Sequence, residues 1–440
     1  MKRNHRAFGL ALGFILTQGL AGCASDSPAP AALDEAALGA VAEQYVKLVL
    51  ALGVHDPNYV DAYYGPEEWR TAAQADALPL EAIAARGDSL AGVVAAMPQS
   101  APGDALLALR RTYLATQLRA LAAHARMLGG ERLSFDDEAR ALYDASPPKH
   151  DVSEFEAVLA ELDGLLPGTG SVAERYAAFR SRYVIPRERL DTVFQAAIAA
   201  CRARTARYLD IPEGESFTVE FVTDQPWSGY NWYQGGLRSL IQVNTDLPIT
   251  IDRAIDLACH EGYPGHHLYN VMLESRLVRG RGWVEYSVYP LFSPQSLIAE
   301  GSANYGIDVA FPGDERLAFE RDSLFPLAGL DPATAADYAR VQQLAARLSY
   351  AGNEAARLYL NGELDAEGTA AWLVRYAMYT PESAAQRVRF MDRYRSYVIN
   401  YNLGRDLVAA YIERGAPDEA ERWRRFGELI SSPRLPGGLQ

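Results

Sequence analysis

Cysteine is scarce in this chain, which has three among 440 residues, at positions 23, 201 and 259. So few cysteines exclude a fold held together by a framework of disulfide bonds. Cys201 and Cys259 could pair in an oxidising compartment. We nevertheless expect both to be small, unpaired hydrophobic side chains inside the core.

Basic residues are too few to balance the acidic ones. There are 42 Lys and Arg against 56 Asp and Glu, which gives a formal net charge of −14. Such a surface repels phosphate backbones, so we expect no nucleic-acid partner. The composition, 49% hydrophobic and 22% charged, is otherwise that of a soluble globular protein.

The N-terminus carries only a short apolar run. Residues 8–16 follow three basic residues and are too few to span a bilayer as a helix. The sequence Leu20-Ala21-Gly22-Cys23 comes next and resembles the lipobox of bacterial lipoproteins. This resemblance implies a signal peptide over 1–22, lipidation of Cys23 and a tether over 23–33. Ala24 after the cysteine implies a cell-envelope protein that is lipid-anchored at the outer membrane and faces the periplasm. The lipid is then expected to be its only contact with the membrane.

Apolar residues recur at helical spacing from about residue 34 to residue 210. One segment, with Leu106, Leu107, Leu114, Leu118 and Leu121 at helical spacing, stops at Gly129-Gly130. Similar patterns predict helices over 36–52, 152–166 and 171–208. We expect an N-terminal helical region over 34–210 that is continuous, as one globular unit, with a second region over 211–440.

The pattern changes after Pro212. Apolar residues alternate over 217–222, and 239–245 has the composition of a second strand. Between them we expect a glycine-rich loop whose aromatic residues either wall a substrate pocket or pack in the core: Trp227, Tyr230, Trp232 and Tyr233. After Pro248 the helical pattern returns. The predicted fold is mainly α, a large helical domain with a small antiparallel sheet directly before a further helix.

Three of the seven histidines lie in the segment 259–267, CHEGYPGHH. Zinc binds His nitrogen and carboxylate oxygen, and a catalytic site keeps one position for a water whose proton an adjacent Glu can take. The usual motif H-E-x-x-H places two histidines on one face of a helix. Here Pro264 stands where the second histidine belongs, so the two ligands cannot come from a regular helix.

Pro264 lacks an N–H and clashes with the carbonyl of His260, while Gly265 permits an unusual turn. If two residues loop out, His266 takes the place of the second ligand, and if three loop out, His267 does. The smaller distortion favours His266. The alternative is that the helix simply ends here and these histidines face solvent.

The motif HEGYPGHH resembles the signature of a bacterial family, domain of unknown function 885, which is grouped with gluzincin-type metallopeptidases. Three further segments resemble elements of this family in the same order: Val243–Pro248, Ala299–Tyr305 and Tyr401–Gly404. The resemblance spans about residue 34 to the C-terminus. It implies that 211–440 is a zincin-like catalytic region, with the small sheet next to the metal-binding helix. The same order is found in thermolysin-like zincins. Ser302 departs from the tryptophan usual in the family's E-G-W-A-x-Y element.

The resemblance, taken with the motif chemistry, implies a complete site. The expected Zn²⁺ ligands are His260, His266 and Glu300, and the expected catalytic residues are Glu261 as general base and Tyr401 as oxyanion donor. Three more residues are expected to hold a ligand imidazole or to contact substrate: His267, Asn304 and Asn244. The strand of Asn244 could bind a peptide by adding it to the sheet edge.

We therefore expect a zinc-dependent hydrolase that cleaves a peptide or small amide. One alternative is a zinc amidase or esterase acting on a non-peptide envelope substrate. Another is an inactive lipoprotein that binds envelope components. Glu261 favours catalysis, because a structural zinc site has no use for a free carboxylate beside its ligand.

Overall fold

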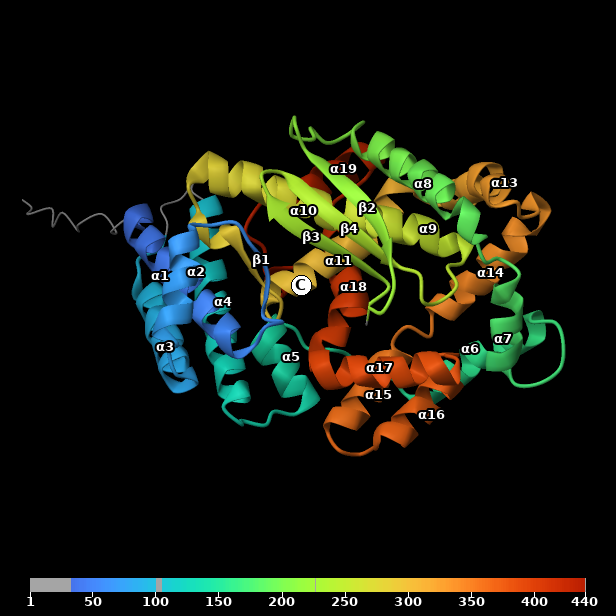
Figure 1. The fold of residues 1–440 in the computed structure, drawn as a ribbon, viewed down its shortest axis with the longest axis horizontal. Coiled ribbons are helices and arrows are strands. Elements are labelled where there is room, and N and C mark those ends of the chain that lie inside the picture. Colours follow the sequence, from blue (N-terminus) through green and yellow to red (C-terminus); the bar gives the residue numbers. More distant parts are fainter. Residues whose placement is uncertain (1–32, 100–104, 226, 440) are drawn as a thin grey trace, which may run out of the picture.

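The computed structural model describes residues 33–99, 105–225 and 227–439. The predicted signal peptide, Cys23 and all of the tether except residue 33 lie outside the described residues. The described chain is mainly helical, as predicted, and its helices pack around two small sheets (Figure 1).

The elements before the larger sheet are α1 (Glu35–His55), β1 (Val60–Tyr63), α2 (Glu67–Asp76), α3 (Leu80–Ala96), α4 (Ala105–Leu128), α5 (Phe135–Tyr143), α6 (Val152–Leu165), α7 (Val172–Ser181), η1 (Arg187–Arg189) and α8 (Leu190–Thr205). The larger sheet and the motif segment contain β2 (Ser216–Val222), β3 (Gly229–Gly235), β4 (Arg238–Asn244), α9 (Ile251–Leu257), η2 (Ala258–Gly262), α10 (His266–Leu273) and η3 (Glu274–Arg279).

The remaining elements follow in one long C-terminal run. They are η4 (Val284–Ser287), β5 (Val288–Pro290), α11 (Pro294–Ala310), α12 (Glu315–Phe319), η5 (Glu320–Leu324), α13 (Phe325–Ala328), η6 (Pro332–Thr334), α14 (Ala335–Ala346), α15 (Ala351–Leu360), α16 (Ala366–Tyr376), α17 (Pro381–Tyr394), η7 (Arg395–Val398), α18 (Ile399–Glu413), α19 (Glu419–Ile430) and η8 (Pro436–Gly438).

Most N-terminal helices occupy the predicted segments, and α4 ends directly before Gly129. The predicted helix over 171–208 is wrong, because this segment forms α7 and α8 with an extended stretch between them. Val184 pairs with Thr250, and the Ile185 N–H donates to the carbonyl of Ile249. Pro186 follows, and a proline disfavours helical backbone in the residue before it.

Helix α1 is the one described helix that is long and apolar enough to cross a membrane by length and composition. Ten of its residues are buried, and it packs against α3 and α4. Its apolar character is therefore explained by burial in the protein core.

The larger sheet has the strand order β2-β4-β3. The two predicted strands, β2 and β4, are present but pair in parallel rather than antiparallel. The antiparallel partner of β4 is β3, which forms from the aromatic segment that we expected to be a loop. Strand β3 can pair closely with β4 because only Gly236 and Leu237 separate them, both with positive φ.

A second, two-stranded sheet joins the two halves of the sequence. Strand β1, inside the region expected to be all helical, pairs antiparallel with β5. A single cluster of buried hydrophobic residues extends from Leu33 to Leu439. The regions 34–210 and 211–440 therefore share one core, and β1 carries the N-terminal region to the neighbourhood of the motif helix.

Helices α11 and α18 cross with their backbones in contact. A Cβ added to Gly301 would lie 2.4 Å from the carbonyl oxygen of Gly404, and one added to Gly404 would lie 2.8 Å from that of Leu297. These glycines follow Glu300 and Tyr401 in the two motif-like segments. Their place in those segments is explained by this close approach, which only glycine allows.

Gly301→Ala should destabilise the fold by about 1–3 kcal/mol, because two backbones rather than flexible side chains must move apart. Urea unfolding of the variant and of wild type measures the difference. Gly352→Ala in α15 is the matched control, since its added Cβ meets nothing within 4 Å. An unfolding midpoint for Gly301→Ala equal to that of wild type would show that the crossing tolerates a side chain.

Candidate functional site

The motif segment is a helix that loosens, breaks and restarts. Helix α9 passes into the π-helical turn η2 at Ala258, the chain leaves helical conformation at Tyr263, and α10 begins at His266. The Gly265 N–H donates to the carbonyl of Cys259. A Cβ on Gly265 would lie 1.9 Å from the His260 carbonyl oxygen, so this return of the chain requires glycine.

The break brings His260 and His266 together with Glu300 of α11. The His260 Nε2 lies 3.1 Å from the His266 Nε2 and 3.3 Å from Glu300 Oε2, and His266 Nε2 lies 3.6 Å from the same oxygen. All three side chains can offer one ligand atom to a common metal ion. The alternative that these histidines face solvent does not hold, since both imidazoles are largely buried.

His267 points away from this cluster. Its Nδ1 lies 2.9 Å from the Ser239 hydroxyl and its Nε2 lies 2.8 Å from Glu215, in a fully buried network. Burial lowers the pKa of His267. This histidine therefore anchors α10 to β4 and to the start of β2, and the structure places it neither beside Glu300 nor at a surface open to substrate.

Asn304 lies one helical turn after Glu300 and faces His260, as expected for a residue that orients an imidazole. Its Oδ1 lies 3.0 Å from His260 Nδ1, and its amide nitrogen donates to the carbonyl of Tyr401. The second bond fixes the amide so that its oxygen accepts from Nδ1–H. The Nε2 lone pair of His260 is then directed toward His266 and Glu300.

Glu300 is held from its other side by Tyr397, whose hydroxyl donates to Oε1 at 2.8 Å. Its second oxygen, Oε2, is buried without a hydrogen-bond partner and faces the two imidazoles. Burial alone would raise the pKa of Glu300, but His266 and His260 outweigh it and hold that pKa well below its usual value. Burial opposes the charged form of His266, yet Glu300 raises its pKa to about 9. The three groups thus form one strongly coupled electrostatic unit.

Glu261 is 4% exposed and lies beside the same cluster. Burial raises the pKa of its carboxyl group, and the charges of His260, His266 and Glu300 also act on it. Within the described residues no side chain donates a hydrogen bond to this carboxylate. A Cβ added to Gly229 of β3 would lie 2.9 Å from its Oε1, so the start of β3 passes directly over the carboxylate.

Tyr401 lies beside Tyr397, one turn further along the chain, and the charges of Glu300 and Glu261 act on its hydroxyl. Its ring packs edge-on against that of Tyr397, with 5.8 Å between centroids, and the Arg387 guanidinium lies over it. Burial and the charge of Glu300 raise its pKa. Tyr397 was not among the predicted site residues, although its spacing of four residues from Tyr401 predicts a shared helix face.

The expected substrate role of Asn244 is not supported by its position. Its amide nitrogen donates to the carbonyls of Gln225 and Trp227, and its oxygen accepts from the Asp246 N–H. Strand β4 is also the central strand, so an added peptide cannot pair with it. The edges of the sheet are β2 and β3.

The aromatic residues of the β3 segment divide between two environments. Tyr233 is buried and its hydroxyl donates to Glu274 at 2.5 Å, so it belongs to the core. Trp232 is 40% exposed, and its ring centroid lies 4.4 Å from that of Tyr230, which in turn lies 5.5 Å from Trp227. Only these last three form a surface that a ligand could reach.

Asp61 of β1 is a second residue that sequence reasoning overlooked. Its carboxylate accepts a hydrogen bond from the Tyr230 hydroxyl and interacts electrostatically with His266, Glu300 and Glu261. Burial raises its pKa to about 6, and the hydrogen bond from Tyr230 opposes that shift. Its position depends on the pairing of β1 with β5, across more than 200 residues of chain, which no local signal reveals.

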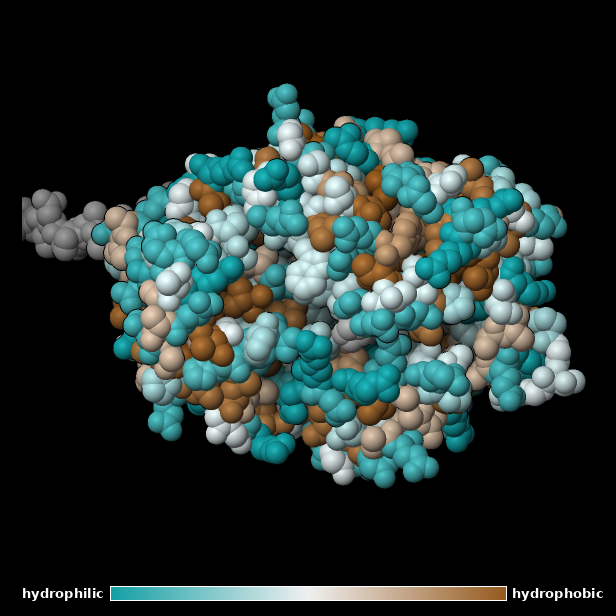
Figure 2. All heavy atoms as spheres, in the orientation of Figure 1, coloured by the Kyte–Doolittle hydropathy of each residue, from teal (hydrophilic) through white to brown (hydrophobic). Residues whose placement is uncertain are grey.

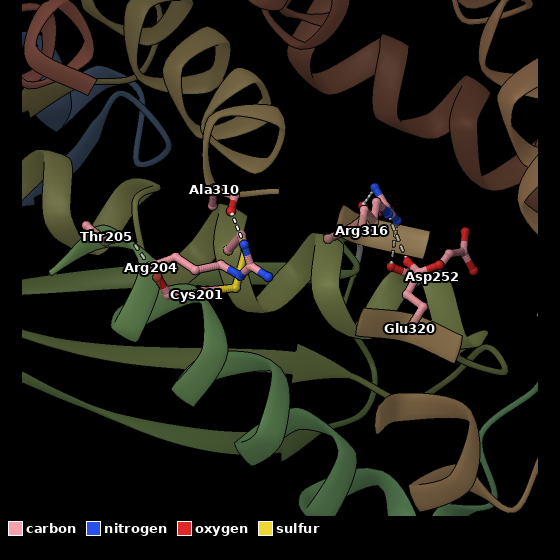
Figure 3. The surroundings of a disulfide bond; sticks show 9 residues. Cys201, Arg204, Thr205, Asp252, Ala310, Arg316 and Glu320 are labelled. Carbon is pink, nitrogen blue, oxygen red and sulfur yellow. Dashed lines mark hydrogen bonds and ion pairs between the residues drawn. A yellow bond between two sulfur atoms is a disulfide. The ribbon is translucent and has the colours of Figure 1, made fainter. Parts of the chain in front are cut away.

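Cys201 and Cys259 form a disulfide bond, contrary to the expectation that they are unpaired. It joins α8 to η2 directly before His260 (Figure 3). Arg204 lies beside it and donates to the carbonyl of Ala310 at the end of α11. Cysteine number alone could not distinguish a pair from two separate thiols, because the helices that carry them are brought together only by the fold.

A cavity of about 650 Å³ lies next to the cluster, between α17 and the loops at one end of the larger sheet. Figure 2 shows this face of the molecule hollowed below the sheet. The cavity is lined by Asp224, Gln225, Asp246, Leu247, Glu382, Gln386, Arg389, Phe390, Arg393 and Tyr394. Phe390 and Tyr394 separate it from Tyr401 and Tyr397, so it approaches the cluster without including it.

Comparison with known proteins identifies a similar fold but no family. No protein-family model matches the chain, so its likeness to domain of unknown function 885 remains a prediction from the motifs. No curated protein sequence matches it either. A protein of Colwellia psychrerythraea assigned as a lipoprotein has a similar structure, with a TM-score of 0.51 and 15% identity over 84% of this chain and 71% of that one. A protein of Shewanella oneidensis assigned as a lipoprotein of unknown function gives a TM-score of 0.45 and 14% identity over 83% and 74%.

Proposed function

We propose that this protein is a zinc-dependent hydrolase that cleaves peptide bonds. The observation that carries the proposal is the convergence of His260 Nε2, His266 Nε2 and Glu300 Oε2, which lie 3.1–3.6 Å from one another. In a tetrahedral zinc site with bonds of about 2.0–2.2 Å, donor atoms stand about 3.3–3.6 Å apart. Glu300 Oε2 is also a buried acceptor without a hydrogen-bond partner, and a bound zinc ion would satisfy it.

Two imidazoles and one carboxylate are the ligand set of catalytic rather than structural zinc sites, since they leave a fourth position open. Zinc held by them supplies a Lewis acid and an activated water. Asn304 keeps the His260 ring in the tautomer that binds through Nε2, and Tyr397 keeps Oε2 of Glu300 directed at the imidazoles.

Glu261 is the proposed general base. Its buried carboxylate has a raised pKa and no competing hydrogen bond within the described residues, so it can accept a proton from the attacking water and pass it to the leaving amine. Tyr401 is the proposed donor to the developing oxyanion, because its hydroxyl stays protonated at neutral pH.

We further propose that the protein is exported and lipid-anchored through Cys23. Three observations support this: the lipobox-like sequence, the lipoprotein assignment of the Colwellia protein with a similar fold, and the disulfide, which persists in oxidising compartments.

Metal analysis of the purified protein tests the proposal. We expect one zinc per chain, lost in His266→Ala and retained in His55→Ala, a variant of an exposed histidine remote from the cluster. The wild type should also hydrolyse members of a broad peptide library. Absence of zinc from wild type would overturn the proposal, and zinc binding without any hydrolysis would favour a binding lipoprotein.

A further inference from the structure

Asp61 occupies a bulge that places it out of the β-ladder. Val60 pairs with Pro290 and Ala62 with Tyr289, so Asp61 has no partner on β5. Bulges bend a strand and redirect a side chain, and they are frequent beside active sites. Here the redirected side chain is a carboxylate, and it comes from the only strand that the N-terminal region contributes within the described residues.

The Asp61 carboxylate lies among groups of the site but has no cationic partner. Its hydrogen bond comes from the neutral Tyr230 hydroxyl, and within the described ranges no Lys, Arg or His nitrogen lies within 4 Å of it. His266, Glu300 and Glu261 are close enough to act on its charge. A half-buried carboxylate without a cation is costly unless a ligand supplies one.

The net charge of the site also favours a positively charged substrate. Asp61, Glu261 and Glu300 together carry three negative charges when ionised. One dication held by two neutral imidazoles leaves one of these charges unbalanced. A substrate that brings a positive charge would balance it.

Aromatic rings lie on the side of Asp61 that faces Tyr230. The Tyr230 hydroxyl donates to the carboxylate, the rings of Trp232 and Trp227 pack against Tyr230, and Tyr394 of α17 is near enough for Asp61 to act on its pKa. Aromatic faces attract cations. An ammonium group next to Asp61 would therefore lie beside aromatic rings as well as a carboxylate.

We propose that Asp61 binds the protonated α-amino group of the substrate, so that this protein acts on peptides with a free N-terminus. The role rests on the proposed hydrolase function. An α-ammonium lies only a few bonds from the first peptide carbonyl. This matches the position of Asp61, because its partner Tyr230 directly follows Gly229, the residue that passes over the Glu261 carboxylate. A lysine side chain would place its charge much farther from that carbonyl.

Binding can be measured without turnover in the zinc-loaded Glu261→Gln protein. Calorimetry with Ala-Phe-Ala-amide and with its N-acetylated form compares the two ligands, and the C-terminal amide removes any contribution from a carboxylate. We expect the free amine to bind more tightly. Adding Asp61→Asn should weaken free-amine binding by about 10- to 100-fold and leave N-acetyl binding unchanged.

Two further variants separate this role from general effects. Asp61→Glu keeps the charge and should keep the preference for the free amine. Asp314→Asn, a change to an exposed acid that lies outside both the cavity and the cluster, should change neither affinity. Equal binding of the two peptides, equal losses with both peptides in Asp61→Asn, or a matching loss in Asp314→Asn would overturn the proposal, as would preferential binding of N-acetyl-Lys-Phe-Ala-amide.

The two proposals fail in different ways. If zinc and the free-amine peptide bind but wild type hydrolyses nothing, the hydrolase function is wrong and the Asp61 assignment stands. If wild type hydrolyses N-acetylated peptides as fast as free ones, the hydrolase function stands and the Asp61 assignment is wrong.

Discussion

Replacing Glu261 by glutamine should lower the rate of peptide hydrolysis by about 10²- to 10⁴-fold, the range that a general base contributes. The amide has nearly the shape of the carboxylate but cannot accept the proton of the attacking water. Zinc content should stay at one per chain, because Glu261 is not among the three converging donors. Single-turnover kinetics on a peptide cleaved by wild type, with metal analysis of the same sample, measures both quantities.

Glu320→Gln is the matched control for this variant. Glu320 of η5 is about as buried as Glu261, but it pairs with Arg316 of α12, outside the cluster. Its replacement should leave the rate near that of wild type. If Glu261→Gln were as active as wild type, another group would have to take the proton, and the mechanism would be wrong.

Removing the disulfide should produce the largest loss of stability. The bond closes a loop across 58 positions, for which the chain-entropy model gives about 4 kcal/mol. The double variant Cys201→Ala, Cys259→Ala should therefore unfold at a clearly lower urea concentration than wild type. Its zinc should also dissociate more readily, since Cys259 directly precedes His260 and ties the π-helical turn to α8.

Treatment of wild type with a mild reductant supplies the control. Both cysteines are fully buried, so the folded protein should keep its bond and its urea midpoint under conditions that reduce the unfolded chain. A double variant with an unchanged midpoint would mean that the packing of α8 on η2 is sufficient without the bond.

The geometry around Pro264 could be predicted from the sequence because it depends on local chemistry. Pro264 forbids a regular helix, Gly265 allows the chain to return to the carbonyls of Cys259 and His260, and a two-residue excursion brings His266 back beside His260. The approach of Glu300 was predicted mainly from the family resemblance, and that of Asn304 from its position one helical turn after Glu300. Their role toward a metal remains a prediction.

The features that sequence reasoning missed depend on contacts distant in the chain. The parallel pairing of β2 with β4 is possible only because β3 enters the sheet on the far side of β4. The bulge at Asp61 is defined by β5, and the disulfide by the packing of α8 against η2. Alternation and helical period describe each segment by itself, so neither could reveal these partners.

The backbone contact between Gly301 and Gly404 has a consequence for protein engineering. Glu300 and Tyr401 are placed relative to each other by main-chain atoms, whose separation does not change when neighbouring side chains are exchanged. Under the proposed hydrolase function, libraries that vary the cavity residues of α17 should alter substrate selectivity while the spacing between Glu300 and Tyr401 is preserved. Directed evolution of this protein would best keep Gly301 and Gly404 fixed and vary the cavity residues of α17.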